Sequence, residues 1–232
     1  KVIEEKGYSQ EAMDLEHEVA QLIFKQEQYG FSFNRVKAEE LYIKLKARSV
    51  ELEEDLQKVF KPIVKERWST KTGKRLKDLV IVFNPSSRHH IAERLKEKYG
   101  WDAQEFTSDG KAKLDDKILS QLKYPEAKIL AEHFLLNKRI AQIATGSQAW
   151  LKHERNGKIH GTCNTNSCVT QRASHSFPNL GQVVSTSAPY GKECRELFTV
   201  PEGKRLVGID VSSLEVMMLC HFMSKFDNGE YT

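Results

Sequence analysis

The sequence has no long hydrophobic run, few cysteines and no metal-binding repeat. No apolar stretch approaches the ~20 residues of a membrane-spanning helix, and the first residues contain no apolar segment typical of a secretory signal. Only Cys163 and Cys168 of the four cysteines lie close together, and no second pair follows. This spacing excludes the common zinc-binding patterns and favours reduced thiols. A content of 39% hydrophobic and 29% charged residues predicts a soluble, folded protein without a membrane association.

Excess charge of one sign is also scarce, except in one segment. The 232 residues carry 36 Lys+Arg and 32 Asp+Glu, a formal net charge of +4. Residues 61–77, however, hold seven basic residues against one acidic residue. Such a charge density must face either solvent or a polyanion. A solvated loop and a nucleic-acid contact therefore both stay open for this segment.

The first half of the chain is predicted to consist of helices joined by short turns. Ser9 and Asn34 are typical N-cap residues, and Gly30 stands where a first helix would end. Leucine spacings of three, four or seven after Asn34 predict a long helix that stops at Pro62. Its apolar stripe consists of Leu41, Leu45, Leu52, Leu56 and Val59. We interpret this stripe as a helix-packing face, with a coiled-coil interaction module as the alternative.

Residues 79–150 are predicted to form one short strand and three further helices. Residues 79–83 are expected to form a buried strand that ends at a turn, whose serines cap a helix from Arg88. Another helix follows Asp115, and a third begins at Pro125. The third helix has a broad apolar face made of Ile129, Leu130, Phe134, Ile140 and Ile143.

From Lys158 onward, short β-branched segments are separated by Gly, Pro, Ser and Asn, which is typical of strands and turns. We therefore place a boundary near residue 150, between a helical region (1–150) and a region with strands (151–232). A strand over 206–209 is expected to deliver Asp210 at its end. A helix with a buried face is expected after Ser213, the face comprising Leu214, Met217, Met218, Cys220 and His221.

A carboxylate at a strand end, beside backbone carbonyls, can hold a hard cation such as Mg2+. Taken alone, Asp210 is equally well a helix cap together with Ser212 and Ser213. The order of the motifs decides between these interpretations. Asp210, Ser212 and Glu215 form a D-x-S-x-x-E motif. Upstream stand Thr170 and Arg172, then Pro178, Asn179, Leu180 and Gln182, then Pro189, Tyr190, Gly191, Cys194, Arg195 and Phe198.

Further motifs precede these: Gly30-Phe31 with Phe33-Asn34, an F-N-P-S-S-R turn at 83–88, and Lys138-Arg139. In this order they resemble family A DNA polymerases, the DNA polymerase I class, and especially the replicative enzymes of short-tailed bacteriophages. The resemblance covers nearly the whole chain. It implies an α+β fold, with a helical thumb over 1–150 and the first, partial antiparallel sheet of the palm over 151–232.

The resemblance also implies template-directed DNA polymerisation, a nucleotidyl transfer assisted by two Mg2+ ions roughly 3.5–4 Å apart. Asp210 would be a catalytic and metal-binding residue, with the Val211 carbonyl as a second ligand. Glu215 and Ser212 would belong to the nucleotide site. Primer-template DNA would be contacted by Arg172 in the minor groove and by a backbone-binding set made of Asn179, Gln182, Lys138 and Arg139. Asn179 retains the alternative of a turn residue after Pro178.

Several features depart from the family pattern. Gln171 replaces the usual Gly before Arg172, Met217 stands where many members have Arg, and the large processivity-factor insertion of some phage relatives is absent. The Lys/Tyr fingers helix and the H-D-E segment with the second aspartate are also absent. We therefore expect a fragment of a longer enzyme.

Such a fragment would be inactive alone, would use primer-template DNA and a dNTP, and would require a second polypeptide with the fingers and remaining palm. Its expected location is the cytoplasm of an infected bacterium. The alternative is a non-catalytic primer-template binding module derived from a polymerase thumb.

Overall fold

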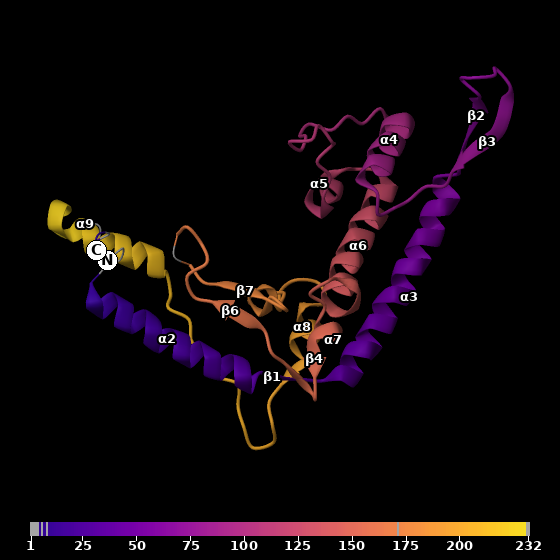
Figure 1. The fold of residues 1–232 in the computed structure, drawn as a ribbon. Coiled ribbons are helices and arrows are strands. Elements are labelled where there is room, and N and C mark those ends of the chain that lie inside the picture. The colour runs from indigo at the N-terminus through magenta and orange to yellow at the C-terminus, as the bar shows by residue number, and fades with distance from the viewer. Residues whose placement is uncertain (1–4, 6, 8, 171, 231–232) are drawn as a thin grey trace. The chain divides into compact units, whose positions relative to one another are not determined.

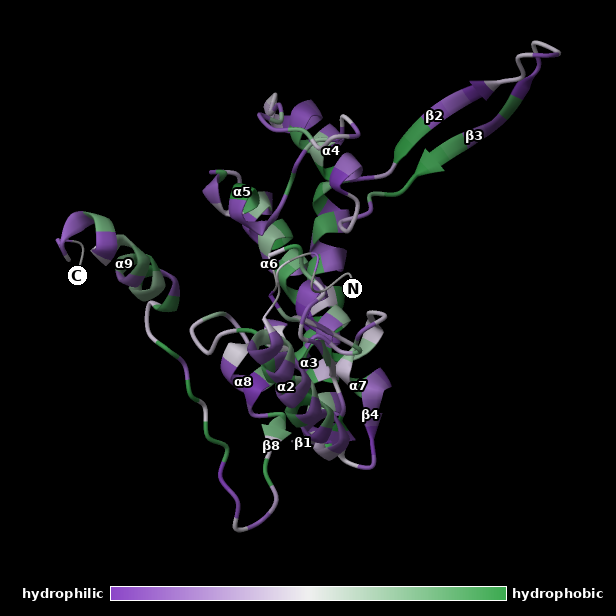
Figure 2. Cartoon of the chain, turned by 60° about the vertical axis from the view of Figure 1, so that its left-hand side comes forward, coloured by the Kyte–Doolittle hydropathy of each residue, from purple (hydrophilic) through white to green (hydrophobic). Residues whose placement is uncertain are grey.

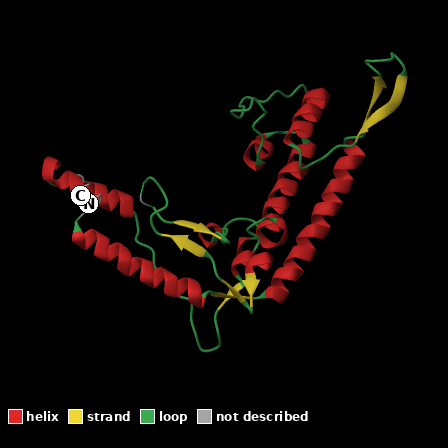
Figure 3. Cartoon of the chain, in the orientation of Figure 1, coloured by secondary structure: helices red, strands yellow, loops and turns green. Residues whose placement is uncertain are grey.

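The computed structural model describes residues 5, 7, 9–170 and 172–230 (Figure 1). The chain divides into two compact units, Lys1–Phe198 and Thr199–Thr232. The secondary structure consists of helices and short antiparallel strands, which confirms the α+β class (Figure 3). The functional boundary near residue 150 stays a prediction. None of the helices in the described part of the chain is both long enough and apolar enough to cross a membrane.

The first two long helices begin and end where the sequence predicts. Helix α2 (Gln10–Tyr29) is capped by the Ser9 side chain, which accepts a hydrogen bond from the Ala12 N–H at 3.2 Å, and it ends at Gly30. Strand β1 (Phe31–Phe33) follows, and Asn34 then caps helix α3 (Arg35–Val59) by accepting from the Lys37 N–H at 3.0 Å. Each cap satisfies a backbone donor that the helix itself leaves unpaired.

Helix α3 packs along helix α6 (Pro125–Ile140), and this pair organises both cores of the first unit (Figure 1). The predicted stripe is buried at Leu41, Leu45, Leu52 and Leu56, but Val59, at the last turn of the helix, is exposed. One core surrounds the first half of α3 and contains Trp150 and Ile159. The other surrounds its second half, with Phe60 and Phe83, and packs against α4 (Arg88–Tyr99) and α5 (Asp116–Gln121).

The predicted helix starts at α4, α5 and α6 are confirmed. The Ser87 hydroxyl accepts from the His90 N–H at 3.3 Å, and the Asp115 carboxylate accepts from the Ile118 N–H at 2.9 Å. Helix α6 begins at Pro125, which suits a first helical position because proline has no N–H to leave unpaired. It continues into a π-helical turn, η1 (Ala141–Thr145).

Two points about residues 61–83 are corrected by the structure. Of the two alternatives left open for the basic segment, a plain loop is contradicted, because β2 (Ile63–Trp68) and β3 (Arg75–Ile81) pair as an antiparallel hairpin, while the nucleic-acid contact stays a prediction. The strand at 79–83 is not buried either: Leu79 is 43% and Val80 is 56% exposed, and only Phe83 enters the core. Figure 2 shows this hairpin as a projecting two-stranded ribbon of mixed hydropathy.

Short strands form the region after α6. Helix α7 (Trp150–His153) leads into a sheet with the order β4-β5-β1-β8, formed by Glu154–Arg155, Lys158–Ile159, Phe31–Phe33 and Phe198–Thr199. A separate hairpin pairs β6 (Thr162–Asn164) with β7 (Ser174–Ser176). A 3-10 turn, η2 (Leu180–Gln182), and helix α8 (Gly191–Arg195) complete the unit.

The described residues of the second unit contain one helix, α9 (Leu214–Asp227), as predicted, but two expectations about this unit were wrong. Residues 206–209 form no strand; Leu206, Val207 and Ile209 are 64%, 75% and 90% exposed. A strand requires a neighbour with which to exchange hydrogen bonds, and no described strand pairs with this segment. The predicted buried face of α9 is likewise exposed, except at Cys220.

Candidate nucleic-acid interface

The C-terminal end of α6 presents two adjacent cations, Lys138 and Arg139. Lys138 donates to the Asp116 carboxylate at 2.5 Å, and this hydrogen bond lowers the pKa of Asp116. Arg139 donates from Nε to the Pro189 carbonyl at 3.4 Å. Lys138 is exposed and Arg139 is half-buried. They are therefore held by single contacts while their remaining N–H groups stay available to an anion.

Lys138 and Arg139 line a cleft of about 470 Å³, which we call the α6 cleft. Asn179 and Gln182 line the same cleft, although they lie some forty residues further along the chain. Four of the five residues predicted to contact DNA thus lie around one cavity. The remaining lining comes from the π-helical turn and its continuation, at Ala141, Gln142, Gly146, Ser147, Gln148 and Trp150.

Gln148 holds the segment that carries Asn179. Its side-chain oxygen accepts hydrogen bonds from the backbone N–H groups of Phe177 and Asn179, each at 3.1 Å. Gln142 acts similarly from the π-helical turn, donating from Nε2 to the Gln182 carbonyl at 2.9 Å. These glutamines were missed by the sequence analysis because no local pattern marks a side chain that bridges two distant segments.

The segment around Asn179 also depends on close backbone approaches. A Cβ on Gly161 would lie 2.8 Å from the Pro178 carbonyl oxygen, so only glycine fits there. Pro178 is buried and follows Phe177 through a cis peptide bond. The Asn179 Oδ1 atom is buried and has no hydrogen-bond partner among the residues described.

Arg172 lies apart from this cleft. It stands in the loop that joins β6 to β7, its side chain is exposed, and it is not among the residues that line the α6 cleft. Its carbonyl accepts from the Cys168 N–H at 3.4 Å. The preceding Gln171 lies outside the described residues.

The Pro-Tyr-Gly and Cys-Arg motifs have structural roles in the first unit. Tyr190 has a φ of +60°, and a Cβ on Gly191 would lie only 1.8 Å from the Ser185 carbonyl oxygen. Arg195 donates from Nε to the Val184 carbonyl at 2.8 Å. Burial raises the pKa of the Cys194 thiol to about 11, so this cysteine is a core residue and not a nucleophile at neutral pH.

Asp210, Val211, Ser212 and Glu215 all lie in the second unit and are exposed. Glu215 is in the first turn of α9, and Ser213, the N-cap residue, forms no side-chain cap hydrogen bond. The Asp210 carboxylate and the Val211 carbonyl are the oxygen donors that Mg2+ prefers. The described residues contain no group of three or more His, Cys, Asp or Glu side chains that could hold a metal. This pair of donors therefore fits a hard cation in kind, and Asp210 is its one carboxylate.

Comparison with known proteins gives a consistent result. A family model described as DNA polymerase family A matches residues 45–227. The DNA-directed DNA polymerases of Enterobacteria phage T3 and Escherichia phage T7 are each 36% identical over 288 aligned positions, which cover 96% of this chain and 41% of the relative. The thermostable DNA polymerase I of Thermus aquaticus is 30% identical over 143 positions, covering 60% of this chain and 17% of that protein.

Among solved structures, the chain resembles the POL domain of Pol1 from M. smegmatis in complex with DNA primer-template and dNTP. The TM-score is 0.58 at 19% identity, over 78% of this chain and 28% of that one, so the likeness concerns the fold. The chain spans about two fifths (41%) of the length of the phage relatives. Their alignments run over 288 positions, so the relatives carry segments without a counterpart among these 232 residues.

Proposed function

The chain belongs to DNA polymerase family A, and on this premise we propose that it forms the thumb and first palm segment of a template-directed DNA polymerase. The observation that carries the proposal is the α6 cleft, where Lys138, Arg139, Asn179 and Gln182 converge from separate segments. Cations and amides together suit a sugar-phosphate backbone, which binds through charge and hydrogen bonds without base specificity. The substrates are primer-template DNA and a dNTP.

Within the cleft, Lys138 and Arg139 bind phosphate oxygens, and Gln182 contributes an amide. Asn179 has a buried Oδ1 atom with no partner among the described residues, next to the cleft. A half-turn of its amide presents the Nδ2 donor at the same point, which suits a phosphate or sugar oxygen. An unpaired buried polar atom costs free energy unless a ligand satisfies it, which supports a binding role over that of a turn residue.

Arg172 acts from the β6–β7 loop in the minor groove, where the acceptors of all base pairs fall in similar positions. In the second unit, Asp210 and the Val211 carbonyl bind Mg2+, while Ser212 and Glu215 contact the incoming nucleotide. When bound, Mg2+ would activate the primer hydroxyl and neutralise charge on the leaving phosphates. The chain contributes a single carboxylate to this site, so we propose that it binds DNA but does not extend a primer alone. A second polypeptide that supplies the fingers and the other aspartate would restore extension.

Equilibrium binding tests the proposal. A fluorescent primer-template is titrated with the chain at several salt concentrations, and Kd is read from anisotropy. We expect Lys138→Ala with Arg139→Ala to weaken binding by roughly ten-fold or more and to lower the salt slope by about 1.8. The matched control is Arg35→Ala with Lys58→Ala, which removes two ion-paired cations that do not line the cleft. Equal weakening by both pairs, or no binding by the unmodified chain, would refute the proposal.

A non-catalytic binding module is the second candidate, because the residues that line the α6 cleft are suited to hold DNA whether or not chemistry follows. Extension assays with a partner chain that carries fingers and the remaining palm separate the two. If the two chains together extend a primer and Asp210→Asn abolishes this extension, the chain is part of a DNA polymerase. Binding without extension, with a well-folded partner present, supports the module.

A further inference from the structure

Helices α3 and α6 pack through the two apolar cores of the first unit, and a polar pair, Glu53 and His133, stands between these cores along both helices. On each helix, the leucine before the polar residue and the leucine after it belong to different cores; they are Leu52 and Leu56 on α3, and Leu130 and Leu136 on α6. His133 is fully buried, whereas the Glu53 side chain is 38% exposed. A buried imidazole among packed leucines calls for polar partners, because the ring loses its contacts with water there.

Both ring nitrogens of His133 have a polar neighbour. Nε2 lies 3.1 Å from Glu53 Oε1, and Nδ1 lies 3.4 Å from the side-chain nitrogen of Asn137. A carboxylate oxygen accepts, so the ring donates from Nε2 to Glu53 and keeps Nδ1 as the acceptor for Asn137. Glu53 Oε1 also accepts at 3.4 Å from the hydroxyl of Ser49, which is buried one turn earlier on α3. Directional contacts to both helices therefore compensate the burial of His133.

The contact between Glu53 and His133 fixes the orientation of α6 on α3 in a way that leucines alone do not. Apolar packing is non-directional, so two leucine faces tolerate small rotations and shifts of one helix against the other. A hydrogen bond, in contrast, weakens steeply when its distance or angle changes. A single polar contact inside an apolar seam is a known means of fixing the register of two helices.

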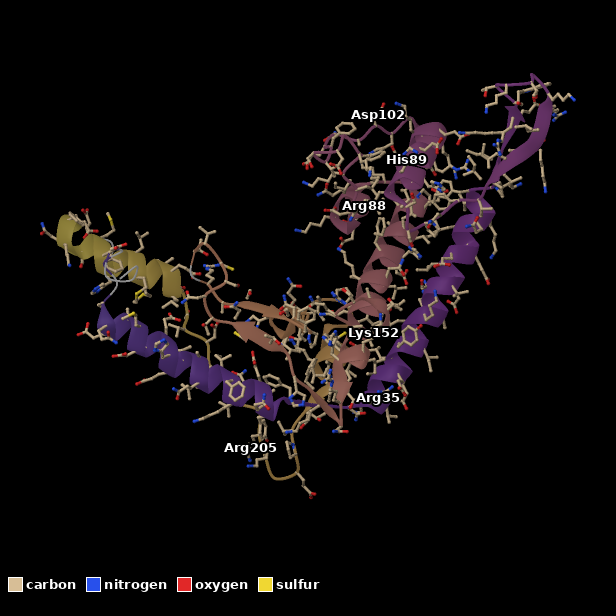
Figure 4. All side chains as sticks on the ribbon, viewed as in Figure 1. Arg35, Arg88, His89, Asp102, Lys152 and Arg205 are labelled. Atoms are coloured by element: carbon tan, nitrogen blue, oxygen red, sulfur yellow. The ribbon has the colours of Figure 1, made fainter. Side chains whose placement is uncertain are left out.

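The orientation of α6 sets the positions of the two cations near its end. Lys138 and Arg139 follow His133 by five and six residues, roughly 7 to 9 Å along the helix axis at 1.5 Å per residue. Glu53 and Lys138 also line one groove of about 520 Å³. Arg88, at the start of α4, lines this groove as well and lies near α6 (Figure 4). A rotation of α6 would therefore move Lys138 and Arg139 out of their places in the α6 cleft.

We propose that Glu53 and His133 are positioning residues for DNA binding, which orient α6 so that the two cations near its end face the primer-template; this rests on the proposed function. The other wall of the α6 cleft depends on the same orientation, because α6 continues into η1, where Gln142 donates to the Gln182 carbonyl at 2.9 Å. A role in stability alone fits less well, since apolar residues of similar volume often stabilise a fold as well as a buried polar pair does.

Anisotropy titration of a fluorescent primer-template tests the pair through a change whose charge effect has the opposite sign. Glu53→Ala removes a carboxylate near a bound polyanion, so electrostatics alone would strengthen binding. We expect Glu53→Ala instead to weaken binding about three- to ten-fold, because α6 is no longer held in place. Glu53→Gln keeps an acceptor oxygen and should bind at least as tightly as the unmodified chain. The matched control is Glu54→Ala, which removes an exposed neighbouring charge that does not line the groove and should not weaken binding.

A second variant, Glu53→Leu with His133→Leu, separates positioning from stability. Because apolar residues replace the whole pair, we expect its thermal midpoint to stay within a few degrees of that of the unmodified chain or to rise. Its Kd should still increase about three- to ten-fold. In this background, removing Lys138 and Arg139 should cost less affinity than in the unmodified chain, since the effects of coupled residues are not additive.

The outcomes separate this proposal from the proposed function. If the Lys138/Arg139 variant loses affinity while Glu53→Ala and the double leucine variant bind like the unmodified chain, the pair is only a core element and the function stands. If Glu53→Gln weakens binding as much as Glu53→Ala, the acceptor oxygen does not position α6 and the proposal is overturned. If the unmodified chain does not bind primer-template, both fail. Circular dichroism confirms folding; should the double leucine variant not fold, the changes at the half-exposed Glu53 decide.

Discussion

The side-chain oxygen of Gln148 accepts a hydrogen bond from the backbone N–H of Asn179 at 3.1 Å, and it accepts a second from Phe177. Through these two bonds a residue just after the π-helical turn positions the wall of the α6 cleft. Gln148 itself is exposed, so it adds little to the core. Its contribution is to fix the backbone on which Asn179 stands.

We expect Gln148→Ala to weaken primer-template binding by about three- to ten-fold, since losing such hydrogen bonds costs on the order of 1 kcal/mol. The thermal midpoint should change by only a few degrees. Anisotropy titration and thermal melting measure the two effects. Ser120→Ala is the control: its hydroxyl donates to the Lys117 carbonyl at 2.7 Å, Ser120 does not line the cleft, and its loss should leave Kd unchanged. Equal affinity of Gln148→Ala and the unmodified chain would show that these bonds do not position the cleft.

Asn179 and Asn137 form a matched pair for separating binding from stability. The Asn179 Oδ1 atom has no partner within the described residues, whereas Asn137 bonds Ser86 and contacts His133. We expect Asn179→Ala to leave the unfolding free energy within about 0.5 kcal/mol but to reduce DNA affinity. Asn137→Ala should instead cost about 1 kcal/mol of stability. Chemical denaturation and anisotropy together decide; a large stability loss in Asn179→Ala would contradict the binding role.

Gly191 tests the Pro-Tyr-Gly turn. A Cβ there would lie 1.8 Å from a backbone oxygen, that of Ser185, which cannot move aside as a flexible side chain would. We expect Gly191→Ala to destabilise the first unit by roughly 2 kcal/mol or more, read from denaturant midpoints. Gly208→Ala is the control, because a Cβ at Gly208 meets nothing within 4 Å and the position has no positive φ. Similar midpoints for both variants would show that the turn relaxes freely.

Glu126 makes stability depend on pH. Burial acts to raise its pKa, but hydrogen bonds from Lys98 and Tyr99, each 2.5 Å long, outweigh burial and hold the pKa below the ordinary 4.5. A carboxylate whose pKa is lowered by folding stabilises the folded state, and this contribution is fully present at pH values above the pKa that the group has in the unfolded chain. The contribution is lost as the pH falls through the pKa that the group has in the folded protein. The contribution of Glu126 is therefore complete at neutral pH and is lost below about pH 4.5.

We expect Glu126→Gln to cost roughly 1–2 kcal/mol at pH 7, with the difference from the unmodified chain shrinking as the pH is lowered toward 3. Urea denaturation across this range measures it. Glu105→Gln serves as the control, since its ion pair with Lys113 is exposed and should contribute little. A difference that stays constant between pH 7 and pH 3 would exclude the ionic contribution.

The helices could be predicted from the sequence because their determinants are local. Asn34, Ser87 and Asp115 each cap the helix that follows, and these caps depend only on residues within one turn. The strands could not be predicted in the same way. Leu79 and Val80 lie in an exposed hairpin, because whether an apolar run is buried depends on what packs against it.

In the candidate site, too, some residues could be predicted from the sequence and others could not. Family motifs predicted Lys138, Arg139, Asn179 and Gln182 as DNA contacts, and the fold brings all four to one cleft. Gln148 could not be predicted, because its partners lie about thirty residues away and no short pattern encodes that pairing. The DNA-binding roles of these four residues stay predictions, as do the roles of Arg172, Asp210, Val211, Ser212 and Glu215.

Helix α9 presents apolar side chains on nearly all sides, with only Cys220 buried. An isolated helix of 14 residues has marginal stability in water, because helix nucleation is unfavourable. Most of the stability of such a helix comes from packing its apolar side chains against other elements. The exposed side chains include Met217, Phe222 and Phe226. We therefore expect the chain to self-associate at micromolar concentration, and Phe222→Ser with Phe226→Ser to reduce this association. Light scattering after size exclusion measures it. Phe106→Ser, an equally exposed position in the first unit, is the control and should leave the mass unchanged. If the unmodified chain is monomeric at this concentration, the exposed apolar side chains of α9 do not drive self-association and the prediction is wrong.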